Sequence, residues 1–299
     1  MKKTLTIGIP AHNEEKNIVS LLNAILMQRR SNYILKHIYV ACDGCTDNTA
    51  LVVSELSKKF PVIELIDDGR RLGQAGRLNE FYRNLDSDIF LTFDADVMLS
   101  NDCVVEEVVR QFNDEEVGLV GGHVLPASQD KFIGRVLEAQ EYFWDKVRQS
   151  LNNGDAFQTH TGPISAGTKK FLSSVSRPKE IVANDQFLYL SAIKNGFLYK
   201  WAKNAIVYIK LPTTFDDYMK QSTRFLDSAA QVKEYFGSWS DSYYAIPYMK
   251  KLRAYILAFL RYPFFMPLVI VFLILQKLLQ QKYRVVRSDG LWTAIKSTK

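Results

Sequence analysis

The sequence lacks the short motifs that mark the most common nucleotide-dependent and hydrolytic enzymes. It contains neither G-x-G-x-x-G nor G-x-x-x-x-G-K-[ST], which argues against a dinucleotide-dependent oxidoreductase and a P-loop enzyme. It also has no serine or cysteine nucleophile elbow. Any catalytic activity must therefore depend on a different set of residues.

Cysteine is scarce as well, with only Cys42, Cys45 and Cys103 in 299 residues. Cys42 and Cys45 form a C-x-x-C motif, but no second pair of cysteine or histidine residues completes a four-ligand zinc site. We expect free thiols in a reducing compartment, with a redox or zinc motif as the alternative. The first apolar run, residues 5–9, is too short for a signal peptide and ends at Pro10, so we expect a cytosolic start.

Basic residues are unevenly placed along the chain. The last fifty residues hold ten Lys or Arg and one acid, a net charge of +9, whereas the whole chain has +6. The other residues therefore form a mildly acidic body with a charge of −3. A basic, apolar tail on an acidic body indicates an anionic membrane surface as the partner and argues against nucleic acid.

The apolar run in this tail is short for a membrane span. Residues 254–275 are apolar except for Arg261, and the uninterrupted part, residues 262–275, has 14 residues. A spanning helix needs about 20 residues. Pro263 and Pro267 also favour a broken element. We therefore expect an interfacial or re-entrant segment rather than a spanning helix, with a buried oligomer contact as a third option.

Short apolar runs alternate with helical patterns in the first hundred residues. Strands are predicted at 4–9, 38–41, 62–66 and 89–93, each followed by a helical segment. This alternation predicts an α/β fold with a doubly wound, mostly parallel sheet. Further along, the sequence predicts strands at 117–124, 198–201 and 205–209 and a helix at 133–151.

Acidic residues follow three of the predicted strands. Glu14 follows the first strand, Asp43 the second, and Asp94 and Asp96 the fourth. Because parallel strands place their carboxyl ends at one edge of a sheet, these acids should converge. Mn²⁺ or Mg²⁺ usually takes one or two protein carboxylates and completes its shell with water and phosphate. We therefore predict a metal–diphosphate site at Asp94 and Asp96, although an isolated pair would more often cap a helix or occupy a solvated turn.

Four segments together resemble the family 2 glycosyltransferases, which have the nucleotide-sugar-binding fold called GT-A. Each segment alone is weakly specific, but their order and spacing are specific jointly, and the resemblance covers about the first 230 residues. The segments are Ile9-Pro10-Ala11-His12-Asn13-Glu14-Glu15, Asp43-Gly44-Cys45-Thr46-Asp47-Asn48-Thr49, Gly73-Gln74-Ala75-Gly76-Arg77-Leu78-Asn79 and Asp94-Ala95-Asp96.

The resemblance assigns roles to residues of the donor site. It implies that Asp94 and Asp96 hold the metal and the ribose-diphosphate, and that Arg77, with Arg70 and Arg71, lies beside the phosphates. A solvated loop and helix face is the alternative for these arginines. The nucleoside would be held by Pro10, Ala11, Glu14 and Asp43, with Asp43 accepting from the base. The sequence departs from the family at Cys45, where Ser is frequent, and at Gln74, where Lys is frequent.

The acceptor side is implied by residues further along. Residues 160–167 resemble the family's small-residue loop, in which Gly162 lets a sugar approach the backbone, and His160 is a donor contact, a buried structural residue or a metal ligand. The family shows Glu-Asp where this chain has Asn184-Asp185, which implies that Asp185 is the catalytic base. A helix N-terminal position is its alternative role.

A last segment resembles the Q-x-x-R-W signature of chain-extending members. Gln221 and Arg224 would contact the donor diphosphate, and Phe225 stands where the family has the Trp that stacks on the acceptor. The replacement of this Trp argues against polymer-type processivity.

The sequence thus predicts a membrane-associated, metal-dependent, inverting glycosyltransferase. Its donor would be a UDP-sugar, its acceptor a saccharide or a lipid-linked molecule, and its location the cytoplasmic face of a membrane. Residues 1–230 would form the catalytic domain, with a nucleotide-binding half at 1–100 and an acceptor half at 101–230, and residues 231–299 a helical membrane-associated tail. The alternatives are a sugar nucleotidyltransferase, which the acidic first loop disfavours, and a non-catalytic membrane adaptor, which the intact acids disfavour.

Overall fold

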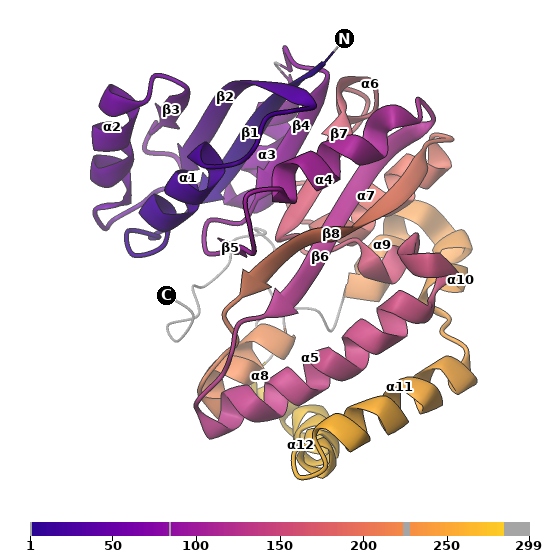
Figure 1. The fold of residues 1–299 in the computed structure, drawn as a ribbon. Helices are drawn as coiled ribbons and strands as arrows, with labels where there is room; N and C mark the ends of the chain where they lie inside the picture. Colours follow the sequence, from indigo (N-terminus) through magenta and orange to yellow (C-terminus); the bar gives the residue numbers. More distant parts are fainter. Residues whose placement is uncertain (1, 84, 224–227, 284–299) are drawn as a thin grey trace.

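The computed structural model describes residues 2–83, 85–223 and 228–283. In these residues one eight-stranded sheet runs through the molecule, with helices on both faces (Figure 1). The strand order is β3-β2-β1-β4-β7-β6-β8-β5. The strands are β1 Lys3–Ala11, β2 Tyr33–Cys42, β3 Ile63–Ile66, β4 Ile89–Phe93, β5 Met98–Leu99, β6 Val117–Pro126, β7 Ile164–Thr168 and β8 Leu198–Ile209.

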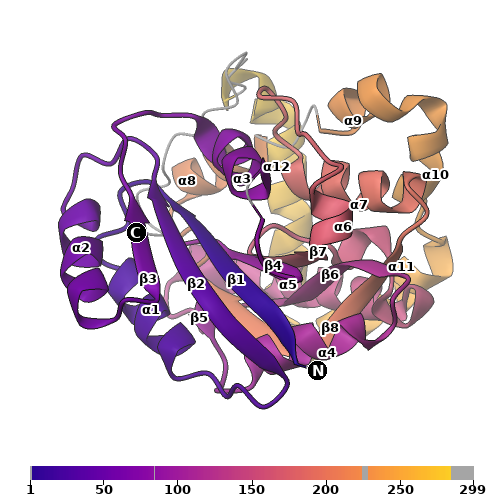
Figure 2. The same ribbon diagram turned by 90° about the horizontal axis from the view of Figure 1, so that it is seen from above.

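The helices form two layers, with α1 and α4 on one face of the sheet and α3 and α7 on the other (Figure 2). This is the doubly wound arrangement that the alternation of strands and helices predicted. The helices are α1 Ile18–Leu26, α2 Thr49–Lys59, α3 Gly73–Arg83, α4 Val104–Arg110, α5 Phe132–Ser150, α6 Lys169–Leu172, α7 Asn184–Lys194, α8 Phe215–Thr223, α9 Ser228–Phe236, α10 Asp241–Tyr244, α11 Tyr248–Arg261 and α12 Met266–Tyr283.

Strand β4 lies in the centre of the sheet and is buried on both faces. Leu91 and Phe93 pack into the core formed with α1 and α4, whereas Phe90 points to the other face and packs against Phe81 and Tyr82 of α3. All five residues of the strand are buried. The apolar run therefore ends where the carboxylates begin, because an uncompensated charge cannot be buried in the sheet.

The sheet is mixed, because β7 runs antiparallel between β4 and β6. Its residues 164–167 belong to the segment predicted as a loop, which is a correction. The strand is short and contains Ala166 and Gly167, which are residue types of low strand propensity, so it gave only a weak strand pattern. The strands predicted at 198–201 and 205–209 form one strand, β8, with a register shift at Gly122 and His123 of β6.

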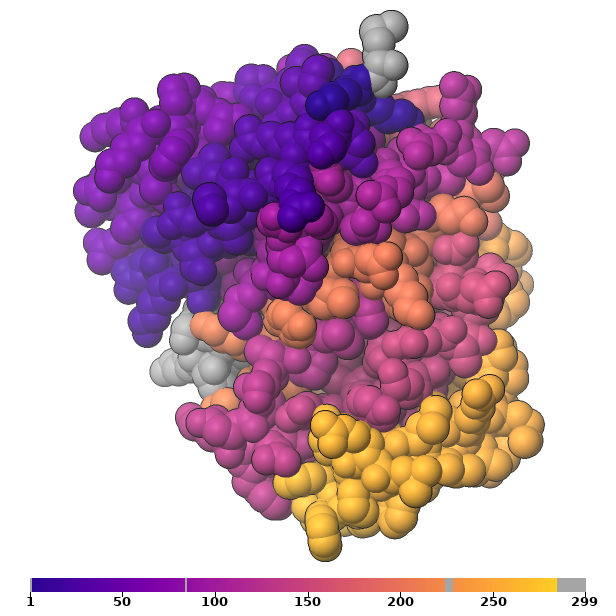
Figure 3. Space-filling view, in the orientation of Figure 1, coloured from indigo at the N-terminus to yellow at the C-terminus, as the bar shows by residue number. Residues whose placement is uncertain are grey.

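The C-terminal helices α11 and α12 lie at one end of the molecule, where both pack against α5 and α12 also packs against α8 (Figures 1 and 3). The helical structure is interrupted between them at residues 262–265, which contain Pro263, whereas Pro267 lies in the first turn of α12. Among the described residues, no helix is long and apolar enough to cross a membrane. The domain boundary at residue 230 stays a prediction.

A buried guanidinium fixes the loops that follow β2 and β3. Arg77 of α3 is fully buried, and all three of its side-chain nitrogens donate hydrogen bonds to protein oxygens. Burial would lower the pKa of Arg77, but its bonds to Asp68 and Asp43 raise this pKa above its ordinary value, so the side chain stays charged. The acceptors are the carboxylates of Asp43, Asp68 and Glu80 and the backbone carbonyls of Cys42 and Arg70.

Replacing this cation should destabilise the protein strongly. Arg77→Met leaves the buried carboxylate of Asp43 without its cation. We therefore expect the free energy of unfolding, measured in urea, to fall by about 3–5 kcal/mol. Arg70→Met is the matched control, because Arg70 pairs with the same Asp68 and Glu80 but is exposed. Arg70→Met should lower the free energy of unfolding by less than about 1 kcal/mol. Equal losses in the two variants would contradict a structural role for Arg77.

Candidate active site

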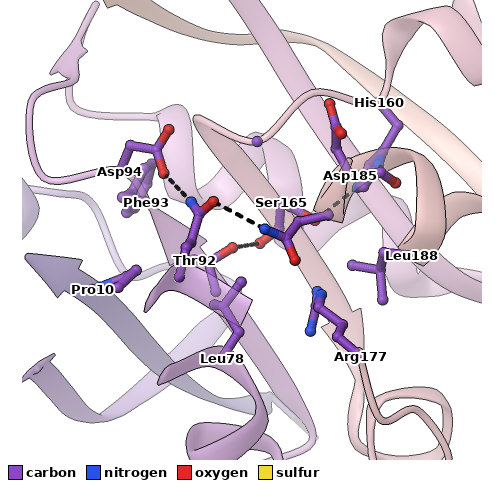
Figure 4. A pocket seen from close by; sticks show the side chains of 13 residues that line it. Pro10, Leu78, Thr92, Phe93, Asp94, His160, Ser165, Arg177, Asp185 and Leu188 are labelled. Carbon is purple, nitrogen blue, oxygen red and sulfur yellow. Dashed lines mark hydrogen bonds between the residues drawn. The ribbon is translucent and has the colours of Figure 1, made fainter. Parts of the chain in front are cut away.

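A pocket opens at the carboxyl ends of the central strands (Figure 4). It brings together residues that lie far apart in the sequence, with Asp94 on one side and Asp185 and Arg177 on the other. The residues that line it are Pro10, Gln74, Leu78, Thr92, Phe93, Asp94, His160, Gly162, Ser165, Arg177, Asn184, Asp185 and Leu188.

Asp94 is the first residue after β4, and its carboxylate lies among other acids. Burial, together with the negative charges of Asp96, Asp185 and Glu14, raises the pKa of Asp94 to about 7. A hydrogen bond from the Gln74 amide, 2.8 Å from Nε2 to Oδ1, acts in the opposite direction. Of the acids that the sequence predicted to converge, Glu14 and Asp96 act on Asp94, whereas Asp43 is not among the charges that shift its pKa. The negative charge around Asp94 makes this position favourable for a cation.

A pair of amides holds Asp94 from one side. Gln74 Nε2 donates to Asp94, while Gln74 Oε1 accepts from Nδ2 of Asn184 at 3.4 Å. Gln74 and Asn184 are the two positions at which the sequence departs from the family's Lys and Glu. The two residues are in contact, and both are neutral amides in this chain.

The residues around Asp94 fit a divalent cation that keeps much of its shell for water and substrate. The described residues contain no group of three or more Asp, Glu, His or Cys side chains arranged as a complete metal site. Two carboxylates suffice for Mn²⁺ or Mg²⁺ when phosphate oxygens and water supply the other ligands. Asp94 and Asp96, on one short turn and electrostatically coupled, provide this donor set.

Asp185 occupies the first turn of α7, next to Asn184. Burial raises its pKa above the ordinary value, while a hydrogen bond from the Gln186 backbone N–H and the charge of Arg177 lower it. The net direction is upward. A carboxylate whose pKa is moved toward neutrality is a better proton acceptor than an ordinary aspartate, as general base catalysis requires.

His160 is a buried residue that positions Asp185. Its Nδ1 lies 2.9 Å from the backbone oxygen of Asp185, and its Nε2 lies 2.8 Å from the Ser165 hydroxyl. A carbonyl oxygen only accepts, so Nδ1 carries the proton and Nε2 accepts from Ser165. Burial lowers the pKa of His160 to about 4. The ring is therefore neutral, and these contacts favour the structural role among the three that were open for His160.

The predicted nucleoside-binding residues lie at the ends of β1 and β2. Pro10 lines the pocket, and the buried Ala11 accepts from the Asp43 backbone N–H at 2.7 Å. The Asp43 carboxylate receives N–H bonds from Leu72 and Gly73 in addition to Arg77. A carboxylate has about four acceptor sites, so it has capacity for one further donor.

Arg77 was predicted to lie beside the donor phosphates, and this stays a prediction, but the residue is fully buried. Its nitrogens are directed at protein acceptors, so it holds the loop of Asp43 in place. Glu14 is also buried and accepts from the side chain of Asn17. Its charge acts on Asp94, so it lies on the metal side of the site.

The structure describes only some of the remaining predicted site residues. A side chain at Gly162 would begin 3.9 Å from Asp94 Oδ2, so the glycine leaves open space beside that carboxylate. Gln221 lies on α8 and is not among the residues that line the pocket. Arg224 and Phe225 lie outside the described residues. The contacts proposed for these three residues stay predictions.

No sequence pattern pointed to Arg177, which lines the pocket beside Asp185. It belongs to none of the family-like segments and lies in an irregular stretch between α6 and α7. It shares its burial with Arg77, but its Nε and Nη1 have no hydrogen-bond partner among the described residues, and both features are visible only in three dimensions.

Curated relatives of the chain are glycosyltransferases. An N-acetylglucosaminyltransferase from Rhizobium meliloti (strain 1021) is 22% identical over 83% of this chain and 58% of its own length. A poly-beta-1,6-N-acetyl-D-glucosamine synthase from Staphylococcus epidermidis is 21% identical over 84% of this chain and 59% of its own length. The chain therefore spans somewhat more than half the length of these relatives.

Solved structures have the same fold. The mannosyltransferase PcManGT from Pyrobaculum calidifontis, in complex with GDP-Man and Mn²⁺, matches with a TM-score of 0.60 and 16% identity over 93% of this chain and 76% of its own. Glucosyl-3-phosphoglycerate synthase from Mycobacterium tuberculosis, with Mn²⁺, UDP and phosphoglyceric acid, matches with a TM-score of 0.53 and 14% identity over 78% of each chain. These similarities confirm the GT-A fold.

The sequence also matches the model of one protein family. The family is described as glycosyl transferase family 2, and its model matches residues 6–172, which include β1 to β7 and the acids after β1, β2 and β4. This match covers more than half of the chain and agrees with the relatives and with the fold. The chain therefore belongs to glycosyl transferase family 2.

Proposed function

We propose that the protein is a metal-dependent, inverting glycosyltransferase that uses a UDP-sugar donor and acts at the surface of a membrane. The observation that carries this proposal is that Asp94 and Asp185 line the same pocket and interact electrostatically. One acid then lies where a donor diphosphate would be held, and the other lies where an acceptor hydroxyl would be deprotonated.

Asp185 would act as the general base. Its carboxylate would take the proton from an acceptor hydroxyl, and the oxygen would attack the anomeric carbon from the face opposite the leaving diphosphate. A single displacement of this kind inverts the configuration at the anomeric carbon. His160 would keep the backbone of Asp185 in position through its Nδ1 hydrogen bond, and burial would keep this ring from becoming charged.

Asp94 and Asp96 would hold Mn²⁺ or Mg²⁺. When bound, the cation would neutralise the negative charge of the diphosphate leaving group. The amide of Gln74 would keep Asp94 Oδ1 oriented without adding a competing positive charge. Arg224, which lies outside the described residues, remains a predicted contact of the diphosphate.

The names of the relatives support the choice of substrates. Two of them are named for N-acetylglucosamine transfer or polymer synthesis, and a hyaluronan synthase from Streptococcus pyogenes is 29% identical over 126 residues. UDP is bound in one of the similar structures and GDP-Man in another. UDP-N-acetylglucosamine is therefore the first donor to test, with a saccharide or a lipid-linked molecule as the acceptor.

The exposed apolar surface of α11 and α12 supports a membrane location. Soluble proteins rarely expose so many large apolar side chains together. Lys250, Lys251, Arg253, Arg261, Lys277 and Lys282 lie on the same two helices, which favours an anionic bilayer as the partner. We call this set the C-terminal apolar surface: Tyr248, Met249, Ile256, Leu257, Phe259, Leu260, Phe264, Ile270, Val271, Leu273, Ile274 and Leu278.

Replacing the proposed base should abolish transfer but not donor binding. In Asp185→Asn we expect kcat to fall by about 10²–10⁴-fold, with the KM for the UDP-sugar unchanged. Only the ionised base is active, and its pKa is raised. As the pH is lowered, the wild-type rate should therefore begin to fall at a higher pH than it would with an ordinary aspartate. Asp241→Asn is the control, since Asp241 also lies in a first helical turn but is exposed. Near-wild-type transfer by Asp185→Asn would refute this role.

Donor binding should depend on the metal and on Asp96. Thermal unfolding with UDP, GDP and UDP-sugars, with and without Mn²⁺, should show stabilisation that requires both UDP and Mn²⁺. At 100 times its dissociation constant a ligand adds about 2.7 kcal/mol. Asp96→Ala should lose this effect, whereas the exposed Asp102→Ala should retain it. If no nucleotide stabilises the wild-type protein, the non-catalytic adaptor becomes the better interpretation.

Membrane binding should depend on the C-terminal apolar surface. The protein should sediment with vesicles that contain anionic lipid and bind neutral vesicles more weakly. Phe264→Asp should weaken binding by about tenfold or more, because a fully buried large apolar side chain contributes about 1.5–3 kcal/mol. Leu51→Asp is the matched control, an exposed apolar residue on α2. Self-association that is lost in Phe264→Asp, without vesicle binding, would instead identify a second copy as the partner.

A further inference from the structure

Arg177 is a buried cation with unused hydrogen-bond donors. The residue is 4% exposed and lines the pocket. Its Nε and Nη1 have no hydrogen-bond partner in the part of the chain that the structure describes. Its Nη2 donates to the Tyr82 hydroxyl at 3.2 Å. No carboxylate of the described residues forms an ion pair with it. A charged group in this state is unfavourable unless a bound molecule or water completes its bonds.

The side chain and its backbone are both held by α3. The guanidinium lies over the Tyr82 ring, 4.7 Å from the ring centroid. The Arg177 backbone N–H donates to Asn79 Oδ1 at 2.9 Å, and Asn79 Nδ2 donates to the Arg177 carbonyl at 2.8 Å. The unpaired donors are therefore on a positioned group, and ordering this group on binding has little entropic cost.

The position of the Arg177 charge indicates on which part of the pocket it acts. Arg177 lowers the pKa of both Asp185 and His160, whereas the charges that act on Asp94 are those of Asp96, Asp185 and Glu14. Figure 4 shows Arg177 on the side of Asp185 and Leu188, across the pocket from Asp94. The cation is thus on the side of the proposed base, where the acceptor would bind, and away from the proposed metal.

We propose that Arg177 binds an anionic group, a carboxylate or a phosphate, that the acceptor carries near its reacting hydroxyl. This inference rests on the proposed function, because it uses Asp185 to locate the acceptor. A guanidinium suits either anion, since it presents several planar N–H donors and stays charged. The acceptor class is then an acidic saccharide or a phosphorylated one.

The inference can be tested without knowledge of the natural acceptor. The wild-type protein, saturated with UDP and Mn²⁺, is titrated with glucose, glucuronate and glucose 6-phosphate, and the dissociation constants are measured by calorimetry. We expect an anionic probe to bind at least tenfold more tightly than glucose. Arg177→Met should remove this preference, and Arg177→Lys should restore part of it. Tyr82→Phe, which removes a hydroxyl but keeps the ring, should preserve it.

The stabilisation by UDP and Mn²⁺ is the internal control. It should be the same in Arg177→Met and in the wild type, because the inference places Arg177 away from the donor diphosphate. Equal binding of all three probes by the wild type, or a preference that persists in Arg177→Met, would overturn the inference and leave the proposed function standing. Absence of any UDP effect in the wild type would overturn the proposed function instead.

A further experiment tests whether the anion belongs to the acceptor or to the donor sugar. UDP-glucuronate and UDP-glucose are compared in the wild type and in Arg177→Met. We expect the variant to change the affinities for the two donors equally. If it weakens UDP-glucuronate alone, the anion belongs to the donor sugar, and the assignment to the acceptor is wrong.

Discussion

Mutual repulsion among carboxylates at one edge of the sheet is the constraint on which this site depends. The fold brings Asp94, Glu14 and Asp185 together from β4, the end of β1 and the start of α7. Burial and this repulsion leave Asp94 with a pKa near 7, a value at which the carboxyl group readily exchanges a proton for a cation. The rigid core of β4 and its neighbours supplies the stability that keeps these charges close. The repulsion among the carboxylates of such a site is relieved when positive charge binds.

The amide pair of Gln74 and Asn184 shows how the chain keeps this balance while departing from its family. A lysine at one position and a glutamate at the other would add one charge of each sign. Here both are neutral and remain in contact. The net charge of the two positions is therefore the same as for one charge of each sign, and Gln74 donates a hydrogen bond to Asp94. Substitution of only one of the two would leave an unbalanced charge next to the metal position.

The sequence predicted those parts of the fold that produce a strong local pattern. Strand β4 was predicted with its observed bounds, because a run of apolar residues, interrupted only by Thr92, ends at two carboxylates. Asp94 and Asp185 were singled out by the family resemblance, and both line the pocket, while their roles stay predictions. Strand β7 was missed, because it is short and contains Ala166 and Gly167, which are residue types of low strand propensity.

The roles of two arginines could not be predicted for a related reason. Arg77 and Arg177 are both buried, but one has acceptors around its guanidinium and the other has two nitrogens without partners. That difference depends on residues from several distant segments and leaves no trace in the local sequence. Sequence patterns therefore located the acids of the site, whereas the assignment of its cations required the packed structure.

The late position of β7 in the chain has a consequence for how the molecule is made. β7 lies between β4 and β6, yet it follows both of them in the sequence. As the polypeptide leaves the ribosome, β4 therefore keeps one hydrogen-bonding edge open until residues 164–168 emerge. An open edge of a central, mostly apolar strand is a template for aggregation. The strand that leads into Asp94 is thus closed late, and nascent chains that stall before residue 164 expose it to other chains.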